Sequence, residues 1–170
     1  MLDYFSPDYY FERFDKISVE FLKKNGIKTL LLDIDNTLAP YQQAEPDEQI
    51  LSWLNDLKDN GIGFAFISNN TSGVRVKRFN KNIGAPAYGD SCKPFASKTI
   101  ARALSALSGD IESSAFLGDQ IFTDVWAGKR CGMRTILVPP IKDLKNPFFR
   151  FKRWLEKPIL NHYFSKNSIT

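Results

Sequence analysis

Short apolar segments alternate with helix-like stretches along most of the chain, and this alternation constrains the fold more than any other feature. The clearest apolar segment is TLLLDI at residues 29–34. It is continuously apolar, as expected of a parallel strand that is covered on both faces. Four more strands are expected at residues 62–67, 87–89, 114–117 and 134–138. The pattern predicts a doubly wound, Rossmann-like α/β fold with a five-stranded parallel sheet.

Helices are expected in the connections between these strands. Pro46 and Asp47 open one helix, in which apolar residues recur at helical spacing, and Gly61 is placed to end it. Pro94 suits the first turn of another helix. Further helices are expected at residues 71–83 and 123–131.

The length of 170 residues supports one compact domain. We expect an aromatic N-terminal arm and a helix that pack on the core at residues 1–28, the core itself at 29–140, and a basic aromatic tail at 141–170. The tail contains seven basic residues against two acidic ones, although the formal net charge of the whole chain is only +4. Such a tail is either a solvated surface or a contact for an anionic partner.

Composition argues against several classes of protein. No segment approaches the roughly 20 apolar residues that span a bilayer, and the N-terminus lacks the basic and apolar regions of a signal peptide. Cys92 and Cys131 are too few for a disulfide framework or a thiolate zinc site. His162 is the single histidine, which limits histidine-based catalysis. We therefore expect a protein of the reducing cytoplasm.

Two carboxylates follow the first predicted strand. Asp33 and Asp35 are two positions apart, so they share one side of the chain while it stays extended. Their repulsion would raise one pKa unless a cation compensates, and Mg²⁺ prefers such hard oxygen ligands. One carboxylate could then attack phosphorus while the other transfers protons. Taken alone, the pair is also compatible with an ordinary capped loop.

Polar residues also follow other strands. Ser68 and Asn69 end the second strand and could hold phosphate oxygens, or simply form a turn. Lys93 could anchor a phosphoryl group and offset the acidic residues, or be a solvated lysine. Asp119 follows the fourth strand and could bind a metal ion. Asp124 could bind or orient metal-bound water, although a carboxylate in the first turn of a helix is also favoured by the helix dipole.

In this order the residues resemble the motifs of the haloacid dehalogenase superfamily of phosphohydrolases. Its first motif, D-x-D-x-[T/V], matches residues 33–37, and its second, a strand-end Ser or Thr, matches Ser68. The lysine of the third motif matches Lys93. The acidic pair of the fourth motif matches Asp119 and Asp124.

This resemblance implies a role for each residue. Asp33 is expected to be the nucleophile, and Asp35 the acid that protonates the leaving group and then activates water. An acidic residue at position 35 supports hydrolysis, because members that transfer without hydrolysis generally have Thr there. Ser68 and Lys93 are expected to hold the phosphoryl group. The implied cofactor is Mg²⁺, and its expected ligands are Asp33, Asp35 through its main-chain carbonyl, Asp119 and Asp124.

The chain is also similar, over nearly its whole length, to the capless YqeG family of bacterial phosphatases. The similarity is carried by NGIKTLLLDIDNTL at residues 25–38, ISNN at 67–70, GDQIFTD at 118–124 and RTILVPPI at 134–141. Neither gap between motifs is long enough for a cap domain, so we expect an open site, roofed at most by a loop at 39–45. The family is related to phosphatidylglycerophosphate phosphatases, which implies a lipid phosphate on the way to phosphatidylglycerol.

The tail offers a route to such a substrate. On a helix, Phe148, Phe151 and Leu155 would share one face, opposite Arg150 and other bases, as in a helix that lies on anionic lipid. Residues 148–157 could therefore contact the inner membrane face. Alternatively, the aromatic residues pack on the domain and the bases face water.

Other functions are compatible with parts of the pattern. The same mechanism could act on a soluble phosphate ester or a phosphoprotein. A receiver-like signalling module would not need an acid at position 35, and nucleic-acid binding by the basic tail is a weaker alternative.

Overall fold

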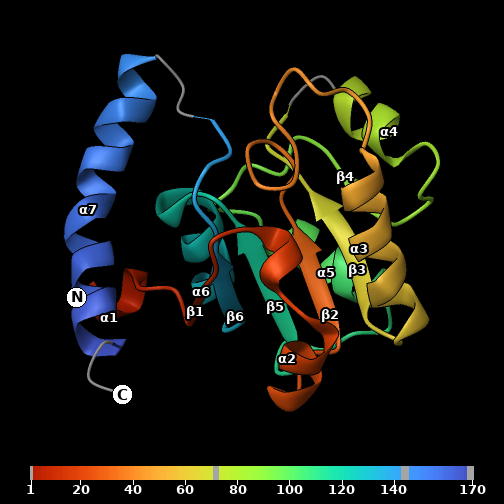
Figure 1. Cartoon of the computed structure of the whole chain (residues 1–170), viewed down its shortest axis with the longest axis horizontal. Helices are drawn as coiled ribbons and strands as arrows, with labels where there is room; N and C mark the ends of the chain where they lie inside the picture. The colour runs from red at the N-terminus through yellow and green to blue at the C-terminus, as the bar shows by residue number, and fades with distance from the viewer. Residues whose placement is uncertain (1, 71–72, 143–145, 168–170) are drawn as a thin grey trace.

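The computed structural model describes residues 2–70, 73–142 and 146–167. Its centre is a parallel sheet of six strands in the order β1-β6-β5-β2-β3-β4 (Figure 1). The strands are β1 (Tyr9–Tyr10), β2 (Thr29–Leu32), β3 (Gly63–Ile67), β4 (Ala87–Tyr88), β5 (Ser114–Gly118) and β6 (Arg134–Leu137). The predicted parallel α/β fold and its five strand positions are confirmed.

The strand count of five is wrong, because the N-terminal arm adds β1 at the edge of the sheet. Tyr9 pairs with Ile136 of β6. The carboxylate of Asp8 accepts a hydrogen bond from the backbone N–H of Thr135 at 2.7 Å. Two residues are too few to show a strand periodicity, and the aromatic sequence around them predicted packing rather than pairing.

Nine helical segments lie in the described residues, and the five longer ones match expected helices or the tail. The α-helices are α1 (Leu2–Phe5), α2 (Val19–Lys24), α3 (Glu48–Asp59), α4 (Val74–Asn80), α5 (Ser97–Ala106), α6 (Trp126–Arg130) and α7 (Pro147–Asn167). The other two segments are the 3₁₀-helix η1 (Phe14–Lys16) and the π-helix η2 (Ile121–Val125). The helix expected at 71–83 is shorter, and residues 71–72 lie outside the described residues. The one expected at 123–131 begins earlier, with η2.

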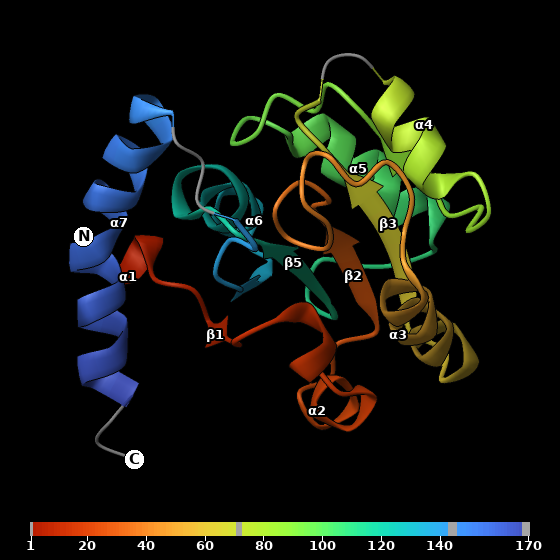
Figure 2. The same cartoon turned by 45° about the horizontal axis from the view of Figure 1, so that its top comes forward.

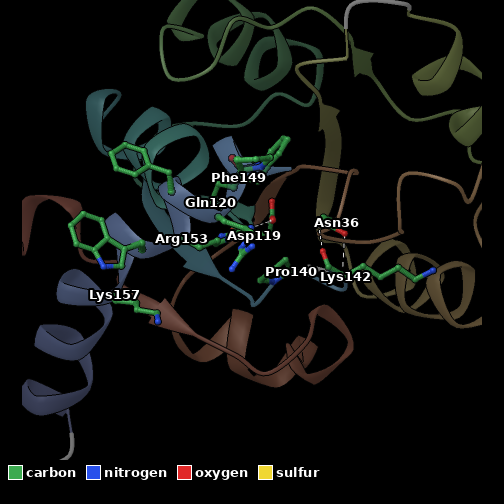
Figure 3. Close-up of a pocket in the computed structure, with 12 residues that line it drawn as sticks. Asn36, Asp119, Gln120, Pro140, Lys142, Phe149, Arg153 and Lys157 are labelled. Carbon is green, nitrogen blue, oxygen red and sulfur yellow. Dashed lines mark hydrogen bonds and ion pairs between the residues drawn. The ribbon is translucent and has the colours of Figure 1, made fainter. Parts of the chain in front are cut away.

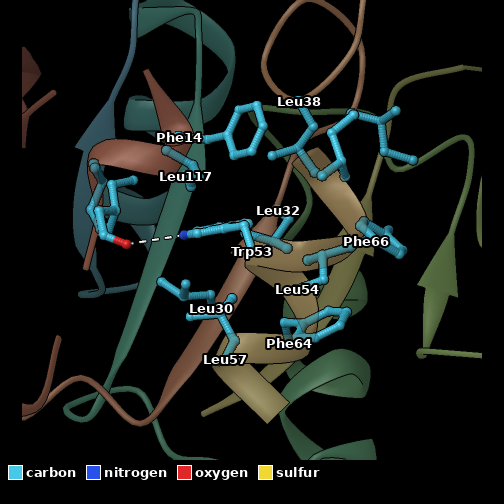
Figure 4. Close-up of a cluster of buried hydrophobic side chains, with 14 of the residues drawn as sticks. Phe14, Leu30, Leu32, Leu38, Trp53, Leu54, Leu57, Phe64, Phe66 and Leu117 are labelled. Carbon is cyan, nitrogen blue, oxygen red and sulfur yellow. Dashed lines mark hydrogen bonds between the residues drawn. The ribbon is translucent and has the colours of Figure 1, made fainter. Parts of the chain in front are cut away.

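The sheet is covered on both faces, as its continuously apolar strands predict. Leu30 and Leu32 face a cluster with Trp53 and Leu54 of α3 and with Phe66 (Figure 4). The intervening Leu31 faces the opposite cluster, which includes residues of α5 and α6. Figures 1 and 2 show α3 and α5 on opposite sides of the sheet. The alternation of β2 side chains therefore builds two cores.

The strand order reverses between β2 and β5. From β2 the chain proceeds to β3 and β4 on one side, then returns to β5 on the other side of β2. In open parallel sheets, ligands bind beyond the carboxyl ends of the strands at such a reversal. The described part of the β2–β3 connection contains a loop and α3, and that of the β3–β4 connection contains α4. Neither described part contains an inserted cap domain.

Helix α7 lies outside the sheet, beside α1, in both views (Figures 1 and 2). Ile159 of α7 is buried against the η2 region, and Tyr10 of β1 packs edge-on against Phe164 with ring centroids 4.9 Å apart. The exposed Asp3 of α1 accepts from Lys166 at 3.0 Å. The described part of the tail is thus a helix docked on the core. Among residues 2–70, 73–142 and 146–167, no helix is both long and apolar enough to cross a membrane.

Candidate active site

Asp33 and Asp35 lie immediately beyond the end of β2. The backbone N–H of Asp33 donates to Leu117 of β5 at 2.9 Å, which keeps the chain extended to this point. Asn36 then takes a left-handed conformation with φ of 67°, a conformation for which Asn is suited. The chain turns there, and Thr37 donates its hydroxyl to Oδ2 of Asp33 at 2.8 Å. The sharp turn therefore leaves both acids at the carboxyl end of β2, which is an inner strand of the sheet.

Lys93 joins two of the predicted acids. Its Nζ lies 2.5 Å from Oδ1 of Asp33 and 2.6 Å from Oδ1 of Asp124, and its side chain is only 2% exposed. Asn69 positions this lysine, because its Oδ1 accepts from the backbone N–H of Lys93 at 2.7 Å. The Oγ of Ser68 is buried and accepts from the backbone N–H of Asn70 at 3.0 Å. Ser68 and Asn69 both line the same pocket as Asp33 and Lys93.

Asp33, Asp119 and Asp124 form a buried group of three carboxylates. One oxygen of each lies within 4.8 Å of the others. The approach of Asp124 depends on Gly118, because a Cβ at that position would lie 2.3 Å from the Asp124 side chain. The backbone N–H of Gln120 donates to Oδ2 of Asp124 at 3.1 Å. The residues expected from the first, third and fourth motifs are therefore brought together.

Asp35 is arranged differently from the other three acids. Its carboxylate is not part of the three-acid group and is paired with Arg75 of α4. Arg75 also donates to the carbonyl oxygens of Gln43 at 2.5 Å and Pro40 at 3.0 Å. The Asp35 side chain still lines the pocket. Arg75 therefore holds both Asp35 and the loop that follows it.

Arg153 is a residue of the site that sequence reasoning missed. Although it lies on α7, its guanidinium pairs with the Asp119 carboxylate and also donates to the Asp119 carbonyl oxygen. It further pairs with Glu156 at 2.8 Å. No pattern in the sequence connects Arg153 to Asp119, and its neighbours indicated only a basic helix. Arg75 was missed for the same reason.

The electrostatics of the group favour a bound cation. Burial raises the pKa of Asp33 to about 8 and that of Asp119 to about 7, against the opposing effects of Lys93 and Arg153. Burial alone would lower the pKa of Lys93, but Asp124 and Asp33 raise it above its ordinary value. Three carboxylates face two cations, so negative charge is left uncompensated when all three are ionised. Such a cluster of hard oxygens suits Mg²⁺.

The pocket around these residues has a volume of about 340 Å³. Asp33, Asp35, Ser68 and Lys93 line it, and Tyr41 lines it from the loop that was expected to be the only roof. Phe149 and Lys152 of α7 also line it. The expectation of a site roofed at most by a loop is therefore incomplete, because α7 contributes to the wall.

A parallel α/β sheet with this ordered set of Asp, Ser, Lys and Asp residues defines a phosphatase of the haloacid dehalogenase superfamily. Within that class, the sequence model of the family described as mitochondrial PGP phosphatase matches residues 3–142. The chain belongs to this family.

A curated relative supports the assignment. The chain is 33% identical over 158 residues to the protein described as probable phosphatase YqeG of Bacillus subtilis (strain 168), which covers 93% of this chain and 91% of the relative. The resemblance to the YqeG family is confirmed.

Solved structures show the same fold. An uncharacterised protein from Listeria monocytogenes serotype 4b matches with a TM-score of 0.54 and 19% identity, over 71% of this chain and 85% of that chain. The cobalt-bound deoxy-D-mannose-octulosonate 8-phosphate phosphatase from Haemophilus influenzae matches with a TM-score of 0.50 and 17% identity, over 83% and 91%. At these identities the likeness concerns the fold alone.

Proposed function

We propose that this phosphatase is a Mg²⁺-dependent phosphomonoester hydrolase that forms an aspartyl-phosphate on Asp33. The observation that carries the proposal is the placement of Asp33 in a buried group with Asp119 and Asp124, where Lys93 contacts two of the three acids. A nucleophilic carboxylate and a fixed cation for phosphate oxygens thus line one pocket, and that carboxylate also belongs to the candidate cation site.

The reaction follows from these positions in two steps. An oxygen of Asp33 attacks phosphorus, the bond from phosphorus to the ester oxygen breaks, and Asp35 gives its proton to the leaving oxygen. Asp35 then takes a proton from a water molecule whose oxygen attacks phosphorus, and inorganic phosphate leaves Asp33. Lys93 and Ser68 hold the phosphoryl oxygens during both steps.

The ion would be held by Asp33, Asp119 and Asp124, together with the main-chain carbonyl of Asp35. When bound, Mg²⁺ supplies positive charge to the oxygens of the transferring phosphoryl group. Arg75 holds the Asp35 carboxylate at the wall of the pocket and outside the three-acid group.

For the substrate we propose phosphatidylglycerophosphate, a lipid that carries a phosphomonoester. The description of the matching family supports this choice. A feature of α7 also supports it, because Phe148, Phe151 and Trp154 are 60%, 56% and 62% exposed on the helix that lines the pocket. Such a face suits peripheral contact with the anionic inner face of a membrane, from the cytoplasm. Each basic residue near that surface adds about 1 kcal/mol to the free energy of binding.

A phosphate-release assay tests both the proposed mechanism at Asp33 and the proposed lipid substrate. Purified protein with Mg²⁺ is given p-nitrophenyl phosphate, a panel of soluble esters, and phosphatidylglycerophosphate in mixed micelles. We expect turnover of the lipid to exceed that of the soluble esters and Asp33→Asn to abolish all turnover while circular dichroism stays unchanged. Full activity of Asp33→Asn would refute the mechanism. Cleavage of soluble esters alone would refute only the lipid substrate.

A further inference from the structure

The guanidinium of Arg75 contacts the Asp35 carboxylate and the loop that follows it at the same time. Its Nε donates to Oδ1 of Asp35, its Nη1 donates to the carbonyl oxygen of Gln43 at 2.5 Å, and its Nη2 donates to that of Pro40 at 3.0 Å. The Arg75 side chain is only 11% exposed. All three nitrogens are thus engaged, in directions that the planar group fixes.

Tyr41 lies in the part of this loop that the guanidinium holds. The backbone N–H of Gln43 donates to the carbonyl oxygen of Pro40 at 3.0 Å, and this turn from Pro40 to Gln43 is called the roof turn below. Tyr41 lines the catalytic pocket together with Asp33. Burial and the nearby carboxylates, that of Asp33 first, raise the pKa of Tyr41. Its hydroxyl therefore keeps its proton and can donate to an oxygen of a bound ester.

The main chain next to Asp35 is fixed by a different set of contacts. The Asn36 side chain donates to the carbonyl oxygen of Lys142 at 2.8 Å and accepts from the backbone N–H of Lys142 at 3.2 Å. Figure 3, a view of the cavity of about 950 Å³ beside the catalytic pocket, marks these contacts with dashed lines. The Asn36 carbonyl oxygen also accepts from the backbone N–H of Ile141 at 3.0 Å. A change at Arg75 therefore leaves these contacts of the main chain in place.

We propose that Arg75 is a positioning residue that fixes the Asp35 carboxylate and the roof turn in one geometry, so that proton transfer and substrate contact by Tyr41 depend on the same guanidinium. The inference rests on the proposed role of Asp35 in proton transfer. Arg75 is not among the residues that line the catalytic pocket, so it acts through Asp35 and Tyr41 rather than on the ester. A lysine at position 75 would keep the charge but could not donate in three fixed directions.

The substitution Arg75→Lys tests this geometry rather than the charge. The matched control is Arg78→Lys in the same helix, because Arg78 is exposed and its contact with Glu45 of the loop is 4.0 Å long. An exposed pair of this kind contributes little. The rates are measured on p-nitrophenyl phosphate and on an alkyl phosphate that the wild-type protein hydrolyses.

We expect Arg75→Lys to lower kcat on the alkyl phosphate by about tenfold or more, with a smaller loss on p-nitrophenyl phosphate, because a displaced acid matters most when the leaving oxygen needs a proton. KM should change less than kcat. Arg78→Lys should retain both rates. An unchanged kcat of the Arg75→Lys variant would overturn the inference.

A double-mutant cycle separates positioning from a general loss of stability. Tyr41→Phe alone should lower kcat/KM by about three- to tenfold, the effect of one lost hydrogen bond. Because Arg75 acts through Asp35 and Tyr41, adding Arg75→Lys to the Asp35→Asn, Tyr41→Phe double variant should cost about twofold at most. The full loss of the single Arg75→Lys variant in that background would contradict positioning through these two residues.

Hydrogen exchange measures the hold on the roof turn without any turnover. Amides of residues 39–45 should exchange about tenfold faster in Arg75→Lys than in Arg78→Lys, whereas amides of β2 and β3 should keep their protection. Unchanged exchange at 39–45, or a general increase over the sheet, would overturn the inference. Asp35→Asn protein shows whether the proposed function fails instead. If its loss is equal on the two esters, proton transfer by Asp35 is refuted, whereas selective exchange at 39–45 would still support the hold on the roof turn.

Discussion

Arg153 on the C-terminal helix pairs with the carboxylate of Asp119 and also donates to its carbonyl oxygen. The two residues are 34 positions apart, and the Asp119 side chain is fully buried. Glu156, one turn further along α7, accepts from the backbone N–H of Ile121 at 2.8 Å and is buried as well. Helix α7 is therefore attached to the segment 119–124, which carries two of the three clustered acids. The helix and the candidate metal site are one structural unit.

Replacing Arg153 by Ala should destabilise the metal-free protein by about 2–3 kcal/mol, because Asp119 would be left buried without its cation. Urea unfolding, without and with Mg²⁺, measures the effect. We expect Mg²⁺ to recover much of the loss, since the ion provides the missing charge. Arg150→Ala, which removes an exposed cation of the same helix, is the control and should change stability little. Equal stability of the two variants without Mg²⁺ would contradict a structural role for the pair.

Lys93→Met should be among the most destabilising substitutions in the metal-free protein. The side chain is buried between Asp33 and Asp124, and removal of one partner of a buried ion pair costs about 3–5 kcal/mol. Thermal unfolding compares this variant with Lys98→Met, which changes an exposed lysine of α5. A melting temperature like that of the control would show that Lys93 does not compensate the negative charge of Asp33 and Asp124.

Asp35→Asn should impair hydrolysis in a way that depends on the leaving group. Loss of general acid catalysis costs about 10²- to 10⁴-fold, and the cost is smaller when the leaving oxygen needs no proton. We therefore expect a greater loss of kcat/KM on an alkyl phosphate than on p-nitrophenyl phosphate. Parallel rate measurements on the two esters check this. The same loss on both would assign Asp35 a role other than protonation of the leaving group.

Stabilisation by Mg²⁺ should increase with pH. The pKa values of Asp33 and Asp119 are raised to about 8 and about 7 by burial, above those of the unfolded chain. The metal-free fold is thus favoured when these groups are protonated, and it loses stability as pH rises through those values. Metal binding requires the deprotonated carboxylates, so the gain from Mg²⁺ rises over the same range.

Melting temperatures with and without Mg²⁺ at about pH 6 and about pH 8.5 measure this linkage. At a concentration near 100 times Kd the ion should add about 2.7 kcal/mol at the higher pH. Asp119→Asn protein is the matched control, and we expect Mg²⁺ to stabilise it less than the wild-type protein. A Mg²⁺ effect that is equal at both pH values would argue against binding at these carboxylates.

Membrane contact by α7 should depend on aromatic and aliphatic side chains that do not line the catalytic pocket. Phe148 and Leu155 are 60% and 39% exposed. Their joint replacement by Ser should weaken sedimentation with anionic liposomes by about tenfold, while turnover of p-nitrophenyl phosphate is kept. The control is Val74→Ser with Ile111→Ser, which removes exposed apolar groups away from α7. Unchanged liposome binding of the Phe148 and Leu155 variant would exclude this face as the membrane contact.

Much of the fold and most of the site could be predicted from local signals. The buried strand before Asp33 shows itself as an apolar run, and parallel strands with intervening helices follow from the repetition of that pattern. Ser68 and Asp119 each follow a strand, and the carboxyl ends of parallel strands lie at the same end of the sheet. The two residues are therefore brought to that end. The site residues that were found are those whose positions are set by strand ends.

The sequence by itself therefore determined the parallel sheet, the order of its acids and the end of the sheet at which they lie, because strand and helix periodicities act over a few residues. Only the tertiary structure decided that Tyr9 adds a strand, that Arg75 holds Asp35, and that Arg153 reaches Asp119. Each of these contacts joins residues that are 34 or more positions apart. No local pattern records such a pairing, since it depends on how complete elements pack and on which buried charge needs a partner.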